Sequence, residues 1–316
     1  MMMYNRKMTI LEFQKHILSW YKTHRRSLPW RNTKDPYKIL VSEVMLQQTQ
    51  VARVLPKYKE FLQKFPTLKI LAKASDKTLL RAWAGLGYWR RAKYLKQIAQ
   101  RILAEAKKTN SQMSPRRPVA GREHRPQNFR DFEGRSLKNL FSKPKNLEKL
   151  PGIGSYTARA LACFAFGNTE AFLDTNIRRV YLHFFFKNKK NVSDKEILAI
   201  AQKVLSQLSY GRRKHVIAPR EWHYALFDYG AMVLKDKRIN RQSKHYAKQS
   251  KFEGSFRSFR TKVMRFLLNQ QNQTATKSRI KRLLKEAQSP YAPEKVLAGL
   301  EKDGLIKKKG RSSYSL

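Results

Sequence analysis

The sequence contains one cysteine, few acidic residues and no long apolar run, and each shortage excludes a class of protein. The single Cys163 lies in the apolar run ALACFAFG, where we expect a buried helix position rather than a nucleophile. Because it has no second cysteine to pair with, no disulfide can form within the chain, which is typical of a reducing compartment. No segment approaches the roughly 20 consecutive apolar residues that a membrane-spanning helix needs, and the first ten residues lack the apolar core of a signal peptide. We therefore expect a cytoplasmic protein with no membrane partner.

The shortage of acidic residues leaves a very large positive charge. The 316 residues include 22 Asp and Glu against 68 Lys and Arg, a formal net charge of +46. Binding to nucleic acid uses such a charge, because many spread cations neutralise phosphates and release counterions. A merely solubilising, ribosome-like surface is the alternative. Hydrophobic residues at 41% and aromatic residues at 11% are sufficient for a folded core.

Apolar residues recur at helical spacings through most of the chain. Residues 9–108 are expected to be mainly α-helical, and the same periodicity resumes at 147 and continues to 233. Four prolines are expected at breaks between the first helices: Pro29, Pro36, Pro56 and Pro66. Residues 109–146 are polar, basic and interrupted by proline and glycine, which predicts an exposed, flexible insertion or a basic arm that becomes ordered on nucleic acid.

The C-terminal part differs from the rest in composition. A basic polar linker is expected over 235–254, followed by a small separate unit over 255–316. In this unit we expect helices over 256–269, 274–287 and 293–302 and two short strands around Lys309 and Gly310. Three helices followed by a hairpin are typical of a winged-helix-like module, and the alternative is a helical cap with a loose basic tail.

The segment LPGIG at 150–154 has the form of a helix-hairpin-helix turn. Gly152 and Gly154 permit positive φ angles and let the backbone approach a DNA phosphate closely. The amides of the helix that begins near Ser155 would then face the anion. A glycine turn alone is weak support for DNA binding, but an apolar helix and a second glycine turn follow it.

Two carboxylates interrupt apolar helical patterns and are the first candidates for chemistry. Asp174 stands where the next helix needs an N-cap, and capping is its structural interpretation; Ser193 or Asp194 is expected to cap the helix after that one. Glu43 lies in the apolar run ILVSEVMLQQT, so it must be paired, for example with Arg31 or Arg91, or lie in a cleft, or be held protonated. One protonated and one ionised carboxyl group are what the cleavage of a glycosidic bond requires.

Four segments, in order and spacing, resemble the helix-hairpin-helix DNA glycosylase superfamily, and within it the MutY-type adenine DNA glycosylases. They are SEVMLQQTQV (42–51), WAGLGYWRRAKYL (83–95), LPGIGSYTA (150–158) and LDTNIRRV (173–180). The resemblance covers roughly residues 9–234 without the insertion. It implies an all-α, two-lobed glycosylase domain over 1–234, ahead of the linker and the winged-helix-like module.

The resemblance also implies an activity, namely excision of a mispaired base by hydrolysis of its N-glycosidic bond after the nucleotide is flipped out of the duplex. Glu43 would be the general acid that protonates the leaving adenine, and Asp174 would stabilise the sugar cation. Tyr156 occupies the position where bifunctional relatives carry a Schiff-base lysine, which predicts a monofunctional enzyme with little strand cleavage of its own.

Further residues match binding positions of the family. Gln48 and Tyr88 match side chains that enter the base stack, although core packing is the alternative for Tyr88. Arg31 matches a pocket residue that contacts the flipped base, and Asn176 belongs to the Asp-X-Asn motif. Gln47, as part of the QQT run, favours adenine as the excised base. The expected partner is duplex DNA with adenine opposite 8-oxoguanine or guanine, bound by a monomer at the nucleoid.

The chain departs from the family at three places. The cysteine spacing C-x6-C-x2-C-x5-C of the family's iron–sulfur site maps onto four residues that cannot bind iron, Leu234, Arg241, Lys244 and Ser250, so we expect no cluster and no cofactor. Tyr224 stands where MutY-type enzymes place an adenine-reading glutamate, and the winged-helix-like module replaces a Nudix-like domain. A thymine or uracil glycosylase for T:G or U:G mismatches, or a non-catalytic DNA-binding protein of the same fold, is therefore the alternative.

Overall fold

The computed structural model describes residues 8–112, 142–210, 217–248 and 250–316. It is predominantly helical with one small sheet, which confirms the predicted fold class. The chain divides into two compact units. The first unit contains the described residues up to 39 together with 142–149 and 153–248, and the second contains 40–112, 150–152 and 250–316. Most of the predicted insertion, 113–141, lies outside the described residues.

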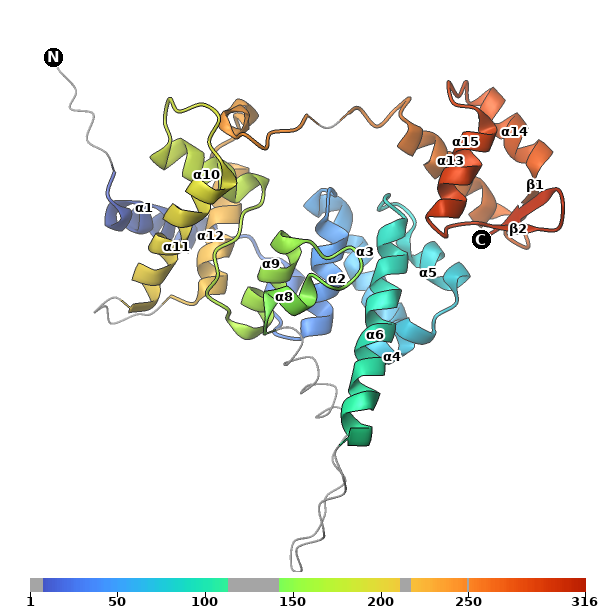
Figure 1. The fold of residues 1–316 in the computed structure, drawn as a ribbon. Helices are drawn as coiled ribbons and strands as arrows, with labels where there is room; N and C mark the ends of the chain where they lie inside the picture. The colour runs from blue at the N-terminus through green and yellow to red at the C-terminus, as the bar shows by residue number, and fades with distance from the viewer. Residues whose placement is uncertain (1–7, 113–141, 211–216, 249) are drawn as a thin grey trace, which may run out of the picture. The chain divides into compact units, whose positions relative to one another are not determined.

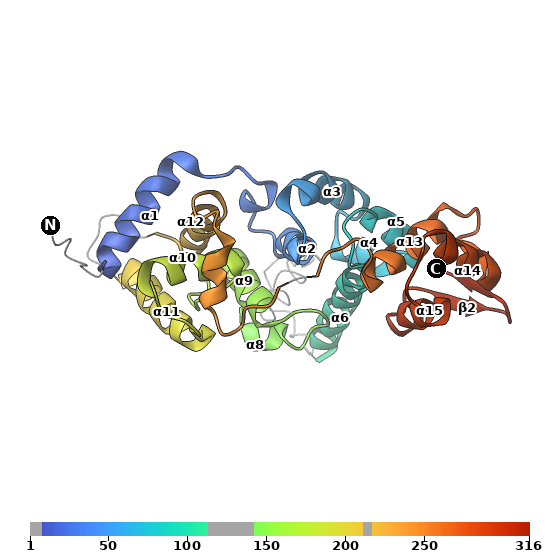
Figure 2. The same cartoon turned by 90° about the horizontal axis from the view of Figure 1, so that it is seen from above.

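The first unit is built from helices around an aromatic core. Its helices are α1 (Ile10–His24), α8 (Pro144–Leu147), α9 (Ser155–Phe166), α10 (Thr175–Phe185), α11 (Asp194–Tyr210) and α12 (Pro219–Met232), with 3₁₀ turns η1 (Pro29–Arg31) and η2 (Lys237–Gln242). Helices α1, α10, α11 and α12 lie side by side (Figures 1 and 2). The fully buried ring of Phe13 packs on the edge of Phe185 at 4.9 Å and of Trp222 at 5.6 Å.

Side-chain caps begin several of these helices. Thr9 and Glu12 form a capping box at the start of α1, since each side chain bonds to the other residue's backbone N–H. Ser193 and Glu196 form the same arrangement before α11, with the Ser193 amide 2.9 Å from the glutamate Oε2. The predicted cap at Ser193 is thus confirmed, and the predicted burial of Cys163 in α9 is confirmed as well.

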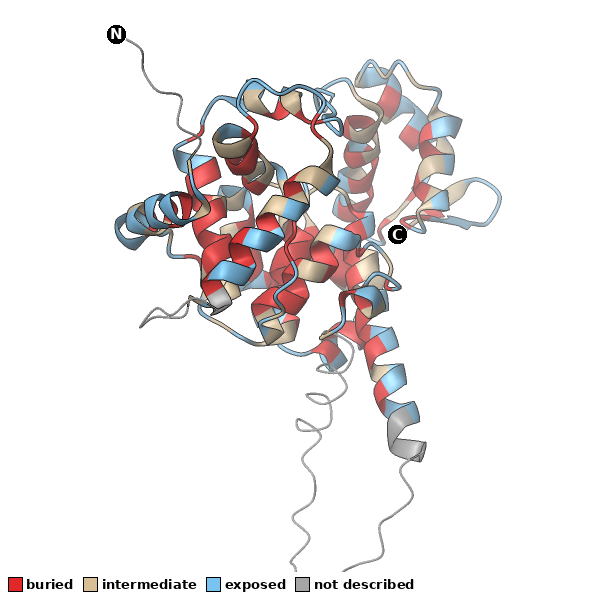
Figure 3. Ribbon diagram, turned by 60° about the vertical axis from the view of Figure 1, so that its left-hand side comes forward, coloured by how far each residue is buried: buried red, intermediate tan, exposed pale blue. Residues whose placement is uncertain are grey.

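In the second unit, α2 (Pro36–Leu46), which starts in the first unit, is followed by four more helices. These are α3 (Val51–Lys64), α4 (Leu68–Lys73), α5 (Asp76–Trp83) and α6 (Arg90–Gln112). Buried residues occur along all of these helices (Figure 3), and Phe61, Phe65 and Trp83 meet in the core.

One predicted helix break is wrong. Pro56 lies inside α3 rather than at its end, whereas Pro29 and Pro36 begin elements and Pro66 follows α3. Proline at position 56 removes the N–H that would bond to the carbonyl four residues earlier, in the second turn of the helix. The helix continues because Val54, Tyr58 and Phe61 bury their side chains on either side of the proline.

The C-terminal part of the second unit contains the residues predicted to form the winged-helix-like module (Figure 1). It contains α13 (Phe256–Asn269), β1 (Thr274–Thr276), α14 (Lys277–Glu286), α15 (Pro293–Lys302), β2 (Lys307–Lys309) and β3 (Ser313–Ser315). The three strands pair antiparallel in the order β1-β3-β2, so that Tyr314 faces both Ala275 and Lys308.

The predicted helix over 274–287 is wrong in its first three residues. Thr274, Ala275 and Thr276 form β1, because two β-branched residues favour the strand and Ala275 is buried on its inner face. Thr276 then caps α14 by accepting a hydrogen bond from the Arg279 amide at 3.3 Å. Among the described residues, no helix has both the length and the apolar character to cross a bilayer.

Candidate active site

Asp174 is the N-cap of α10, as its structural interpretation predicted. Its Oδ1 accepts a hydrogen bond from the Ile177 amide at 2.6 Å, and its Oδ2 accepts one from the Asn176 side-chain amide at 3.0 Å. Burial raises the pKa of this half-buried carboxyl group, against the opposing effect of these hydrogen bonds and of nearby Arg178. Both oxygens are therefore fixed in direction in a partly desolvated place, where a negative charge acts strongly on a nearby cation.

An aromatic cluster lies beside this cap. Phe172, two residues before Asp174, stacks on His223 at 3.9 Å and receives the edge of Tyr156 at 5.7 Å. Burial lowers the pKa of His223 to about 4, so its ring is neutral near pH 7. The structure thus brings Tyr156 and Asp174 into one neighbourhood of the first unit.

Arg31 is held in a buried ion pair. Its guanidinium donates to both carboxylate oxygens of Asp228, at 2.7 and 2.8 Å, and lies 4.5 Å from the centre of the Tyr224 ring. Asp228 also accepts hydrogen bonds from Arg26. Arg31, the predicted base contact, is therefore in direct contact with Tyr224, which stands at the family's glutamate position. Asp228 orients the Arg31 guanidinium.

Glu43 lies in the middle of α2 and is 6% exposed. The apolar run at 39–49 is helical as far as Leu46 and buried as far as Met45. A carboxyl group in such a place is a candidate proton donor for a bound base.

Arg91 fixes the turn that follows α2. Its guanidinium is buried and donates to six acceptors, the main-chain carbonyls of Val44, Met45, Gln47, Leu86 and Gly87 and the hydroxyl of Thr49. Burial lowers its pKa to about 10. A cation at the C-terminal end of α2 satisfies carbonyls that the helix leaves unpaired, and it ties the QQT turn to the turn before α6.

These two turns present Gln48 and Tyr88 with unusual backbone angles. Gln48 has φ of 53° and Tyr88 has φ of 45°, in the left-handed region that side chains other than glycine rarely adopt. Such strain is frequent at functional sites. Both residues, with Gln47, line one cavity of about 520 Å³ within the second unit.

The glycine hairpin partly differs from its prediction. Gly152 has φ of +73°, and a Cβ there would overlap the Tyr94 ring. The Gly152 carbonyl accepts a hydrogen bond from the side-chain Nε2 of Gln47 at 3.2 Å. The positive φ predicted for Gly154 is wrong, because this residue is the extended N-cap of α9 with φ of −90°. A Cβ at Gly154 would meet no atom within 4 Å, so the backbone there is open. Ser155 begins α9, as expected.

Alanine at position 152 is expected to lower the free energy of unfolding by about 1–3 kcal/mol, because the positive φ is strained for alanine and the Tyr94 ring must move. Alanine at 154 is the matched control, with an expected cost below about 1 kcal/mol. Urea unfolding followed by circular dichroism measures both. Equal losses for the two variants would contradict the assigned geometry.

A sequence profile of the HhH-GPD superfamily of base excision DNA repair proteins matches residues 41–214, more than half of the chain. The chain belongs to this superfamily. It is 32% identical over 227 residues to an adenine DNA glycosylase of Buchnera aphidicola subsp. Baizongia pistaciae, a match covering 72% of this chain and 54% of the relative. It is 40% identical over 165 residues to the adenine DNA glycosylase of Mycolicibacterium smegmatis, covering 52% and 46%. The chain thus spans about half the length of these relatives.

Two solved structures share the fold of this HhH-GPD protein. A thermostable thymine-DNA glycosylase aligns with a TM-score of 0.52 and 24% identity over 74% of this chain and 90% of its own. The 3-methyladenine DNA glycosylase of H. pylori bound to 1,N6-ethenoadenine aligns with a TM-score of 0.52 and 16% identity, over 73% and 99%. At these identities the likeness establishes the fold alone.

In this HhH-GPD protein, the segment at the predicted iron–sulfur positions is held by protein contacts. Arg179 is buried on α10 and donates to the carbonyls of Gly230 at 2.8 Å and Leu234 at 3.0 Å. The backbone of Val192 forms hydrogen bonds with the two residues that flank Ser243. Its N–H donates to the Gln242 carbonyl, and its carbonyl accepts from the Lys244 N–H. Leu234 is buried, whereas Arg241, Lys244 and Ser250 are exposed. The predicted linker therefore begins with ordered structure, η2 and this bridge.

Sequence reasoning missed two elements of the site. Asp228, which orients Arg31, sits in the apolar run ALFDYGAMV, and a carboxylate in that pattern was the available signal. Arg91 was considered only as a partner of Glu43, although its position in the helical pattern with Ala92 and Leu95 predicted burial. Its role as a main-chain clamp depends on two turns about 40 residues apart and could not be inferred from spacing.

Proposed function

We propose that this protein is a DNA glycosylase that hydrolyses the N-glycosidic bond of adenine mispaired with 8-oxoguanine or guanine in duplex DNA. Membership of the HhH-GPD superfamily and similarity to adenine DNA glycosylases support this proposal. The observation that carries it is Asp174, a carboxylate whose two oxygens are both fixed by hydrogen bonds where burial raises its pKa.

The proposed reaction divides the chemistry between two carboxyl groups. Glu43 donates a proton to the adenine ring, so that the bond between the base and C1′ breaks and its electron pair leaves with the base. The sugar is left with a developing positive charge, which the Asp174 carboxylate stabilises. Water then adds to C1′ and its proton passes to Glu43, which yields free adenine and an abasic site.

Tyr156 supports a monofunctional enzyme, because a phenol cannot form the Schiff base through which a lysine cleaves the strand. Arg31, at the family's base-contacting position, is fixed by Asp228 and by the Tyr224 ring. The expected working form is a monomer at its DNA in the nucleoid. The +46 charge favours duplex DNA as the partner through phosphate neutralisation.

Purified protein incubated with duplexes holding A:8-oxoguanine, A:G, T:G or U:G, followed by alkali, tests this function. We expect alkali-dependent breaks at both adenine mispairs and no break without alkali. Breaks at T:G or U:G alone would reassign the protein as a pyrimidine glycosylase. Tight DNA binding without any excision would reduce it to a DNA-binding protein.

We further propose that the 234–250 segment holds its shape without an iron–sulfur cluster, because leucine, arginine, lysine and serine are not ligands of such clusters. Methionine at position 179 is expected to lower the free energy of unfolding by about 2–3 kcal/mol, since two buried carbonyls lose a charged donor. Urea unfolding measures this loss, with exposed Arg238→Met as a control that changes little. Iron in the purified protein, or a melting temperature that falls on iron chelation, would contradict the proposal.

A further inference from the structure

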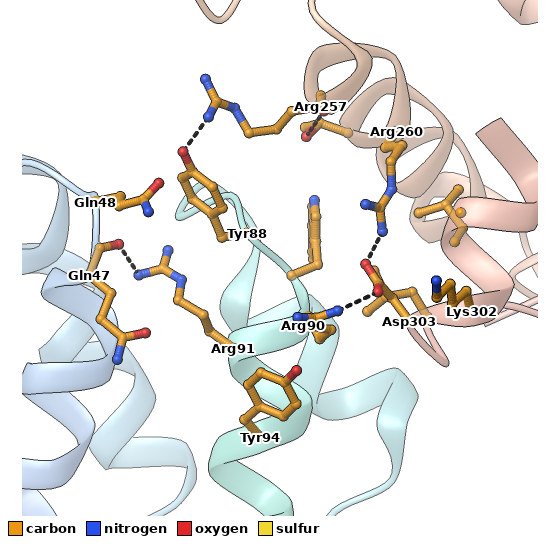
Figure 4. Close-up of a pocket in the computed structure, with 15 residues that line it drawn as sticks. Gln47, Gln48, Tyr88, Arg90, Arg91, Tyr94, Arg257, Arg260, Lys302 and Asp303 are labelled. Atoms are coloured by element: carbon orange, nitrogen blue, oxygen red, sulfur yellow. Dashed lines mark hydrogen bonds and ion pairs between the residues drawn. The ribbon is translucent and has the colours of Figure 1, made fainter. Parts of the chain in front are cut away.

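The cavity beside Gln48 and Tyr88 has walls from two parts of the second unit. One wall is the turn before α6 with the start of that helix, and the other comes from α13 and α15 of the winged-helix-like module. Figure 4 shows side chains from both walls extending toward each other. Its volume of about 520 Å³ lies within the range of about 300–1,000 Å³ that is usual for ligand sites.

The charge of the cavity is strongly positive. Its lining includes five cationic side chains and one carboxylate, namely Arg90, Arg91, Arg257, Arg260, Lys302 and Asp303. Asp303 is shared, since it accepts from Arg90 at 2.8 Å and also pairs with Arg260. A single carboxylate cannot neutralise this group of cations, so the cavity favours an anionic ligand.

The cavity also carries donors that protein groups do not use. The Nε1 of Trp89 and the Nε atoms of Arg257 and Arg260 are buried without an acceptor among the described residues. A buried donor without a partner costs roughly 1–3 kcal/mol, and native structures retain few of them without a reason. A ligand rich in acceptor oxygens satisfies such donors once the side chains that cover them move aside.

A planar surface stands next to these donors. The Arg257 guanidinium bonds to the Tyr88 hydroxyl and lies 4.9 Å from the centre of that ring, and Arg91 lies 5.3 Å from the same ring. Aromatic and guanidinium planes are the surfaces on which proteins stack unpaired bases. Gln48 and Tyr88, both with positive φ, line the cavity beside this surface.

We propose that this cavity binds one phosphate group of a DNA strand through Arg257, Arg260 and Lys302, next to the ring of Tyr88. The winged-helix-like module is then part of the DNA-binding surface rather than an appended unit. This assignment rests on the proposed action on DNA and adds to it a binding subsite outside the two catalytic carboxyl groups. Binding of the phosphate draws Arg260 away from Asp303, whose carboxylate competes with the phosphate for this guanidinium.

The test compares the affinities of full-length variants for a labelled duplex with an A:G mispair, by fluorescence anisotropy at several salt concentrations. Arg257→Ala with Arg260→Ala is expected to weaken binding about tenfold and to lower the salt dependence by about one phosphate contact or more. Arg265→Ala, an exposed arginine on the same helix, is the matched control and should change affinity less than twofold. A double variant that binds as the control does would overturn the proposal.

Asp303→Asn separates ligand binding from a purely structural role of the arginines. It removes the competing carboxylate and keeps every cation, so DNA affinity should stay equal or increase. If Arg90 and Arg260 serve only to attach the module through Asp303, this variant should weaken DNA binding as much as the double variant does. That outcome would refute the assignment. Its outcome decides the question even where the double variant does not fold.

Two further comparisons identify the ligand and separate this inference from the glycosylase proposal. Titration calorimetry with deoxyguanosine monophosphate and with inorganic phosphate should show only weak binding. Tight binding of either ligand, together with unchanged DNA affinity of the double variant, would identify the site as one for a free metabolite rather than for DNA. Excision is scored separately. If the native protein excises no base while the double variant still loses DNA affinity, the glycosylase function is refuted and the binding site is not.

Discussion

Asparagine at position 174 should leave the fold and DNA binding intact and lower the rate of base excision by about a thousandfold or more. The sugar develops positive charge as the base departs, and a fixed carboxylate in a partly desolvated place lowers the energy of that state. A neutral amide of the same shape lacks this effect. The loss should appear in the single-turnover rate at saturating DNA, where binding no longer contributes.

The fold should survive because asparagine retains the cap. Its side-chain oxygen can accept the hydrogen bond from the Ile177 amide, and asparagine is as good an N-cap as aspartate. The Asn176 amide, which donates to Asp174 in the native protein, can rotate to present its oxygen to the new NH₂ group. No hydrogen bond of the cap is therefore lost.

The stability of this variant has a predictable pH dependence. Burial raises the pKa of Asp174 in the folded state above its unfolded value of about 3.9, so the ionised carboxylate costs folding free energy at neutral pH. The native protein therefore loses stability as the pH rises from about 4 through the raised pKa, while asparagine does not titrate. The variant should equal or exceed the native protein in melting temperature at pH 7, and the difference should shrink on acidification.

Single-turnover excision, anisotropy and thermal unfolding measure the three parts of this prediction. Asp236→Asn is the control, because Asp236 also caps a helical turn, η2, and plays no part in the proposed chemistry. Native excision by the Asp174 variant would show that the residue is only a cap. Loss of DNA binding together with excision would show a structural defect instead.

Features set by neighbouring residues could be predicted from the sequence. The caps at Asp174 and Ser193, the positive φ at Gly152 and the burial of Cys163 all depend on a few adjacent positions. The errors arose where tertiary packing overrides local preference. Pro56 stays helical because its neighbours are anchored in the core, and 274–276 form a strand because Tyr314, about 40 residues later, pairs with Ala275.

The site divides in the same way. Glu43 and Asp174 could be selected because each interrupts an apolar pattern, which is visible in one sequence. Arg31 and Asp228 are 197 positions apart in the sequence, and Arg257 and Tyr88 are 169 apart. No local sequence pattern predicts contacts over such separations. The basic character of the C-terminal module was evident, but the assignment of its arginines to one cavity required the structure.

Glutamine at position 43 is expected to lower the single-turnover excision rate by about a hundredfold to ten-thousandfold, the usual contribution of a positioned acid. The adenine anion is a poor leaving group, and protonation lets the base leave as neutral adenine. Glutamine is close to glutamate in shape but cannot donate this proton. The buried α2 should accept the change, since glutamine adds no volume and removes a potential buried charge.

Glu60→Gln on the exposed face of α3 is the control for this variant, and its excision rate should match that of the native protein. The double variant with Asp174→Asn gives the sharper test. When two residues act in one chemical step, removing the first already removes most of the contribution of the second. The double variant should therefore excise the base little more slowly than the slower single variant. Multiplied losses would mean that Glu43 and Asp174 act on separate steps, and an undiminished rate with glutamine at 43 would leave the departure of adenine without its proposed acid.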